Sequence, residues 1–200
     1  FVMRRLVAIA MTCAAMGIGI SSGAYAATFK WASQGDILTF DPHAQNEAFN
    51  NTANSYVYEA LLNLNKGKVQ PCLAESWTSV PEGFVFKLRK GVKFHEGEPL
   101  TAEDVAFSIN RALHPISQFK TLTAGILGAE ALPNGDVLIR TINHSPVLLN
   151  QLAYLRILNK AWAEKHGAAA PQNFVAKEEA YAAKHANGTA VSYTHLRAHE

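Results

Sequence analysis

A strict alternation of apolar and polar side chains gives the clearest strand signal in the chain. Phe84, Phe86 and Leu88 occupy every second position, which places them on one face of an extended strand. The preceding Pro81-Glu82-Gly83 predicts a turn, and after a glycine the alternation resumes over 92–94. The pattern predicts a β-hairpin-like unit whose aromatic face packs inward.

Helical spacing of apolar residues recurs along the chain. It predicts a helix over 50–64, ended by Gly67. Another helix begins at Thr101, whose hydroxyl can cap the backbone while Asp104 stands at the third helical position. Further predicted elements are a strand over 27–33, a short helical or turn segment over 71–77, strand-turn-strand over 131–142, and helices over 145–155, 161–166 and 176–185. The sum is a mixed fold of class α/β.

The first residues have the pattern of a secretory signal. Two arginines precede an uncharged apolar run from Leu6 to Ile20, and the small-x-small sequence Ala24-Tyr25-Ala26 follows. A transmembrane anchor is the alternative, but the run is short of the roughly 20 residues that a bilayer core needs. We expect residues 1–26 to be a cleaved signal peptide, with translation starting at Met3, and the protein to be exported.

The composition is that of an ordinary globular protein, with 48% apolar and 17% charged residues. Between residues 27 and 190, 15 basic residues balance 15 acidic ones, so the chain lacks the overall basic charge typical of nucleic-acid binding. Without the signal segment one cysteine remains, Cys72, which excludes an internal disulfide. We interpret Cys72 as a small buried residue rather than a reactive thiol.

Residue types that carry catalysis or bind metals do not form a recognisable site in the sequence. There is no glycine-rich phosphate loop and no Gly-x-Ser-x-Gly motif. His95 would need a nucleophile, for which Ser108 is a candidate. Glu103 and Asp104 are adjacent, so on a helix they point in different directions and suit the positive helix N-terminus. With no catalytic residue, metal ligand set or cofactor motif, the sequence favours a binding protein over an enzyme.

Three motifs between residues 69 and 113 carry a family resemblance. They are LAESW at 73–77, FKLRKGVKFHEG at 86–97 and PLTAEDVAFS at 99–108. In these motifs the chain resembles the extracytoplasmic solute-binding proteins of peptide- and nickel-type ABC importers, family 5. The resemblance implies a two-lobed, periplasmic-binding-protein-like α/β fold. Residues 27–190 would supply its N-terminal portion, an incomplete first lobe, with the second lobe missing.

The resemblance also implies a function. The protein would be the substrate-binding component of an ABC importer, capturing di- or oligopeptides in the periplasm and delivering them to membrane permease subunits driven by a separate ATPase. It would be a monomer when full length. The same fold binding nickel, haem or another small solute, or serving as a secreted non-transport receptor, remains an alternative. A secreted hydrolase is a rival from another class, and it would need a nucleophile or metal cluster that the sequence does not show.

The resemblance points to three ligand-binding residues in this part of the chain. By their position in the family, Phe49, Asn50 and Asn51 are expected to line the ligand cleft from the start of the first helix. The alternative interpretation of the same residues is a solvated loop and a helix cap.

The last ten residues, VSYTHLRAHE, include His195 and His199, which have the spacing of two zinc ligands on one helix face. Family members commonly continue after Asn-Gly-Thr into Gly-Pro and an aromatic residue, whereas here Thr189 is followed by Ala190 and this decapeptide. The decapeptide is similar to a translated reading frame of a common transposase-based sequencing adapter. We expect residues 191–200 to be adapter-derived, not part of the protein, and to form no metal site. A genuine tail, which would call for a metal titration, is the alternative.

Overall fold

The computed structural model describes residues 35–143 and 146–191 of the chain. They belong to the second of two compact units into which the chain divides, Gly35–Glu200. The predicted signal segment, the strand predicted over 27–33 and the two histidines of the tail lie outside the described residues. Within the described ranges, no helix is both long and apolar enough to cross a bilayer.

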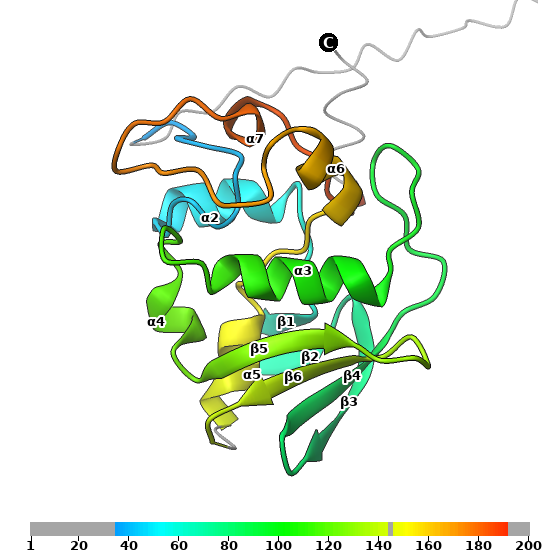
Figure 1. Cartoon of the computed structure of the whole chain (residues 1–200). Coiled ribbons are helices and arrows are strands. Elements are labelled where there is room, and N and C mark those ends of the chain that lie inside the picture. Colours follow the sequence, from blue (N-terminus) through cyan, green and yellow to red (C-terminus); the bar gives the residue numbers. More distant parts are fainter. Residues whose placement is uncertain (1–34, 144–145, 192–200) are drawn as a thin grey trace, which may run out of the picture. The chain divides into compact units, whose positions relative to one another are not determined.

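A four-stranded antiparallel sheet in the order β3-β4-β6-β5 lies in the lower part of the view in Figure 1. Its strands are β3 (Ala74–Val80), β4 (Gly83–Leu88), β5 (Ile126–Ala131) and β6 (Val137–Thr141). Phe84 pairs with Ile139 and Phe86 with Val137, and all four side chains are buried. The predicted strand with an inward aromatic face is confirmed, as is the strand-turn-strand around 133–136.

The segment over 71–77, predicted as helical or as a turn, instead leads into the edge strand β3. Trp77 of β3 pairs with Phe86 of β4, and their ring centroids are 6.5 Å apart. Packing of Trp77 against the core therefore overrides the weak local preference. The hairpin predicted between the strand over 84–88 and residues 92–94 was wrong. Residues 92–94 form only an isolated bridge, between Lys93 and Pro99.

The helix predicted over 50–64 is wrong in its second half. The structure has instead, in chain order, α2 (Ala48–Ser55), β1 (Leu62–Asn65) and β2 (Lys68–Pro71). Lys66 and Gly67 form the turn of the β1–β2 hairpin with φ angles of 50° and 76°, the positive values that a type I′ turn needs. One straight helix would not serve here, because Val57 and Leu61 pack into two different apolar clusters.

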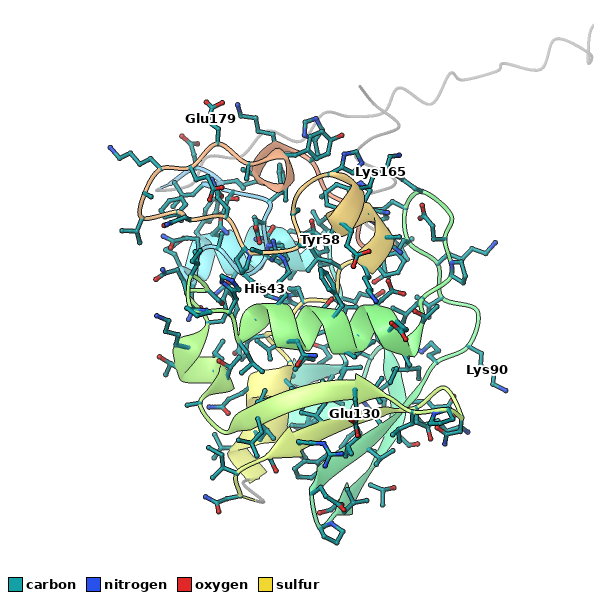
Figure 2. The ribbon with its side chains drawn as sticks, in the orientation of Figure 1. His43, Tyr58, Lys90, Glu130, Lys165 and Glu179 are labelled. Carbon is teal, nitrogen blue, oxygen red and sulfur yellow. The ribbon has the colours of Figure 1, made fainter. Side chains whose placement is uncertain are left out.

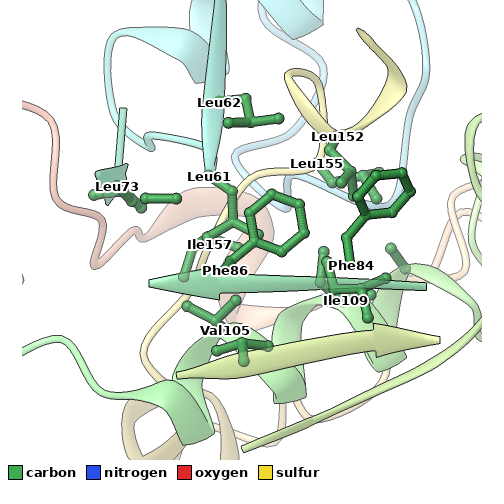
Figure 3. Close-up of a cluster of buried hydrophobic side chains, with 14 of the residues drawn as sticks. Leu61, Leu62, Leu73, Phe84, Phe86, Val105, Ile109, Leu152, Leu155 and Ile157 are labelled. Atoms are coloured by element: carbon green, nitrogen blue, oxygen red, sulfur yellow. The ribbon is translucent and has the colours of Figure 1, made fainter. Parts of the chain in front are cut away.

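The helix predicted from Thr101 is confirmed as α3 (Ala102–Ala112), which lies along the sheet. Its capping box is complete, since the Asp104 amide donates to Thr101 Oγ1 at 3.3 Å and the Thr101 amide donates to Asp104 Oδ2 at 2.9 Å. Val105 and Ile109 on its apolar face pack into the core with the two phenylalanines of β4 (Figure 3). The cap and the buried face together fix where α3 begins and how it is oriented.

A second layer covers the side of α3 that faces away from the sheet (Figure 1). We call residues 35–60 and 158–191 the outer layer; it contains α2 and the short helices α6 and α7. The remaining helices are α4 (Lys120–Thr123), α5 (Pro146–Leu152), α6 (Lys160–Lys165) and α7 (Tyr181–Lys184). The predictions that match α5 and α6 are confirmed, whereas α7 is shorter than the helix predicted over 176–185.

The chain passes between the two layers twice, and the two passages lie side by side. Ala60 and Arg156 form an antiparallel bridge, and the Ile157 amide donates to the Glu59 carbonyl at 2.9 Å. This pairing joins the start of the sheet layer to its end and brings Arg156 close to the outer layer.

An extended segment at 187–190 lies between two loops. The His95 amide donates to the Gly188 carbonyl at 2.9 Å, and the Gly188 amide donates to His95 Nδ1 at 3.1 Å. From the other side, the Ala190 amide donates to the Val57 carbonyl at 3.1 Å. A Cβ atom on Gly188 would lie 2.1 Å from that carbonyl oxygen, so only glycine fits in this passage.

Candidate functional site

A hollow of about 520 Å³ lies where α2 meets α4 and the chain that follows α5. Glu47 caps the start of α2, and its carboxylate accepts hydrogen bonds from the amides of Phe49 and Asn50 at 3.0 and 2.9 Å. We call this cavity the α2 hollow. Its polar lining residues are Asn46, Asn51, Thr52, Ser55, Tyr154 and Arg156.

The three residues expected to line a ligand cleft do not point to one place. Asn51 lines the α2 hollow, and its Nδ2 donates to Asn46 Oδ1 at 2.8 Å. The Asn50 side chain is buried elsewhere, and its Oδ1 accepts from the amides of Leu38 and Thr39 at 3.0 and 3.1 Å. Phe49 is half-buried and does not line the hollow. The structure thus brings Asn51 to the candidate site and gives Asn50 a part in holding the preceding loop.

Arg156 is the one charged residue that lines the α2 hollow, and sequence reasoning missed it. Burial lowers the pKa of its guanidinium, while Cys72, Tyr154 and Glu59 act in the opposite direction. The guanidinium donates no hydrogen bond to any residue in the described ranges. A half-buried guanidinium with its donors unused is suited to a carboxylate, which it can bind through two parallel hydrogen bonds. Nothing in the local sequence marks Arg156, because only the fold brings it beside α2.

A second cluster of ionisable groups lies between α2 and α3, where Figure 2 labels His43. The guanidinium of Arg111 donates to both carboxylate oxygens of Asp41, at 2.8 and 2.7 Å, and its Nη1 lies 3.2 Å from His43 Nδ1. It also donates to the carbonyls of Ala168 and Ala170 at 2.9 and 3.0 Å. Arg111 therefore ties the loop after residue 40, α3 and the chain near residue 170 together.

The protonation states of this cluster follow from its contacts. Burial alone would raise the pKa of Asp41, but Arg111 outweighs it and the pKa lies below its ordinary value. Burial and then Arg111 lower the pKa of His43 to about 3. Arg111 donates to His43 Nδ1, so Nε2 carries the proton and donates to the Arg156 carbonyl at 3.1 Å. The cluster is a satisfied structural anchor rather than an open site.

His95 and Ser108, considered above as a catalytic pair, have separate partners. Ser108 is buried, and its hydroxyl donates to the Asp104 carbonyl at 2.7 Å and accepts from the Leu158 amide at 2.9 Å. His95 binds the 187–190 segment through Nδ1 and Nε2. No three histidine, cysteine or acidic residues of the described part lie close enough to hold a metal ion.

Comparison with known proteins identifies the family to which the chain belongs. The model for bacterial extracellular solute-binding proteins of family 5, described as their middle part, matches residues 68–190. The chain belongs to this family, as the motifs between 69 and 113 indicated, and its relatives are substrate-binding proteins rather than enzymes.

Several relatives and solved structures are similar to the chain. Haem-binding protein A of Haemophilus influenzae is 35% identical over 109 residues, covering 49% of this chain and 20% of the relative. Glutathione-binding protein GsiB of Escherichia coli is 30% identical over 139 residues, covering 66% of this chain and 27% of the relative. The structure of MoaA with mannopinic acid, from A. tumefaciens, has a TM-score of 0.60 and 33% identity and covers 66% of this chain and 29% of that one. The chain thus spans less than a third of the length of each of these proteins.

Proposed function

We propose that this chain is the N-terminal portion of the substrate-binding component of an ABC importer, and that its α2 hollow receives an anionic group of the solute. The observation that carries the proposal is Arg156, a half-buried guanidinium that donates no hydrogen bond to any described residue. A solute carboxylate there would satisfy the guanidinium, and Asn46 and Asn51, which also line the hollow, would offer further hydrogen-bonding groups. Of the three predicted ligand-binding residues, only Asn51 keeps that role in this proposal.

Di- and oligopeptides are the solute class that we propose. A peptide C-terminus is a carboxylate, and the flanking amides suit an extended main chain. The named solutes of the similar proteins, among them haem, glutathione and mannopinic acid, are also carboxylic acids. A nickel chelate or haem is the second candidate. In either case the solute would be enclosed by closure of two lobes in the periplasm and then delivered to the permease and its ATPase.

Replacing Arg156 by glutamine in the complete protein should weaken peptide binding by about 10- to 100-fold, because a charge-assisted hydrogen-bonded pair is lost. Calorimetry with alanine peptides of two to five residues, each as free acid and as C-terminal amide, measures this loss. The amides should bind the parent weakly and be indifferent to the substitution. Arg140→Gln, which removes an exposed arginine of β6, is the matched control and should change nothing.

Equal affinity of Arg156→Gln and the parent for the free acids would refute the role of Arg156. Binding of a nickel–histidine chelate or of haem, with no peptide bound, would select the second candidate. If none of these solutes binds, the importer function itself fails.

We further propose that residues 27–190 are the natural part of the chain, between a cleaved signal peptide and an adapter-derived tail. Amplifying and resequencing the source DNA across the codon for Thr189 should give Gly-Pro-aromatic and several hundred further codons. That sequence would also supply the complete protein used in the experiments described here. A genomic sequence that encodes VSYTHLRAHE and then stops would overturn the proposal and call for a metal titration of His195 and His199.

A further inference from the structure

A second hollow, of about 530 Å³, lies between the end of β4, the start of α3 and the turn before β6. Four basic residues line it, namely Lys87, Arg89, Lys90 and Lys93. We call it the basic hollow. It shares no lining residue with the α2 hollow.

The positive charge here is a local concentration. Residues 35–143 and 146–191 together contain 14 lysines and arginines and 15 aspartates and glutamates. Four of those 14 cations fall within seven consecutive residues, 87–93. The described part is therefore not basic as a whole, and the patch needs an explanation of its own.

The backbone holds these cations on a fixed surface. Leu88 and Val92 pack against the core and Phe94 is buried in it, so the alternate positions of the chain turn outward. Gly91, with a φ of 76°, makes the turn between them. All four basic residues are exposed, and Figure 2 shows Lys90 projecting from the chain after β4.

Most of this charge is not neutralised within the described residues. Lys87 pairs with Glu75 at 2.6 Å, but Arg89, Lys90 and Lys93 form no ion pair with any residue in those ranges. Asp136 is the one acidic residue in the lining. The hollow therefore presents a net positive surface.

We propose that the basic hollow docks an acidic segment of the membrane permease; this inference rests on the importer function proposed above. The cations line a concavity from one segment of the chain, and a protruding protein segment can enter this concavity whereas a flat lipid surface cannot. Asp136 can pair with a basic side chain of a protein segment, a partner that a small free anion lacks. The start of α3 adds little attraction, since Asp104 already occupies its capping position. Complementary charge of this kind steers association and fixes the register of two proteins.

The test compares two charge-matched double variants of the complete protein. One is Arg89→Gln with Lys93→Gln in the basic hollow, and the control is Lys165→Gln with Lys184→Gln, two exposed lysines of the outer layer. Binding to the neighbouring-gene permease in neutral-lipid nanodiscs is measured at about 50 mM salt, where surface charges are weakly screened. We expect affinity to fall about 10-fold or more in the first variant and to change less than about 2-fold in the control.

Competition by peptides, binding to two other anionic partners and solute binding decide between the explanations. A capped hexaglutamate peptide should compete with the permease for the parent protein, whereas the hexaglutamine peptide should not. Equal permease affinity of the two double variants would overturn the proposal. So would a result in which the basic-hollow variant loses affinity only for phosphatidylglycerol vesicles or for inorganic phosphate and keeps its affinity for the permease. Peptide-solute binding should remain normal in both variants. If the parent protein binds neither solute nor permease, the proposed importer function itself is refuted, together with the docking surface that rests on it.

Discussion

Replacing Arg111 by methionine in the complete protein should lower the free energy of unfolding by about 3–5 kcal/mol, because it leaves a buried carboxylate without its counter-charge. The side chains of Arg111 and Asp41 are 0% and 1% exposed. The substitution also removes the donors to the Ala168 and Ala170 carbonyls. Urea unfolding followed by circular dichroism measures the change.

Arg140→Met is the matched control for this prediction. Arg140 forms an ion pair with Glu130 at the same 2.7 Å distance, but the two side chains are 46% and 48% exposed. Exposed pairs of this kind contribute about 1 kcal/mol or less. If both variants lose the same stability, burial is not what makes the Arg111 pair important.

A double variant separates the lost charge from the lost packing. Asp41→Asn added to Arg111→Met removes the buried charge but retains an oxygen that can accept from the Gln172 or His43 amide, as Asp41 does at 2.8 and 3.1 Å. We expect the double variant to be more stable than Arg111→Met alone. A further loss of stability would mean that the hydrogen bonds of Asp41, and not its charge, dominate.

The sequence indicated the sheet layer well because its signals are local. Alternating Phe84 and Phe86, the Thr101 capping box and the turn at 133–136 each specify their own conformation over a few residues. The errors at 50–64 and 71–77 arose where tertiary packing decides. The second half of 50–64 has helical spacing but leads into the β1–β2 hairpin, because Val57 and Leu61 are buried in different clusters.

The candidate site was harder to foresee for a related reason. Family position pointed to the start of α2, and Asn51 does line the α2 hollow. Arg156 follows 105 positions later in an apolar stretch with no motif, and it reaches the hollow because the two chain passages at Ala60 and Arg156 pair with each other. Long-range pairing of this kind leaves no trace in residue spacing. The buried pair of Asp41 and Arg111 was missed for the same reason.

The pH dependence of stability provides the second large effect, and His43 is its main source. The folded state lowers the pKa of His43 to about 3 from an ordinary 6.5. Between these two pH values His43 is therefore protonated in the unfolded chain but neutral in the folded protein. Stability is therefore unaffected by His43 above about pH 6.5. It falls as the pH drops toward 3, by up to roughly 1.4 kcal/mol per pH unit and on the order of 5 kcal/mol in all. Urea unfolding at half-unit steps from pH 7.5 to 4.5 measures this slope.

His43→Asn should flatten the stability profile between pH 6.5 and 4.5, because asparagine does not titrate and its side-chain oxygen can still accept from Arg111. The variant should be less stable than the parent at pH 7.5, where it loses the bond to the Arg156 carbonyl, and should approach or overtake it near pH 4.5. Asp41 contributes in a different window. Its pKa is lowered in the folded state, so its stabilisation is present above about pH 4 and is lost only below that value. An unchanged slope in His43→Asn would show that another group, and not the buried imidazole, controls acid stability in this range.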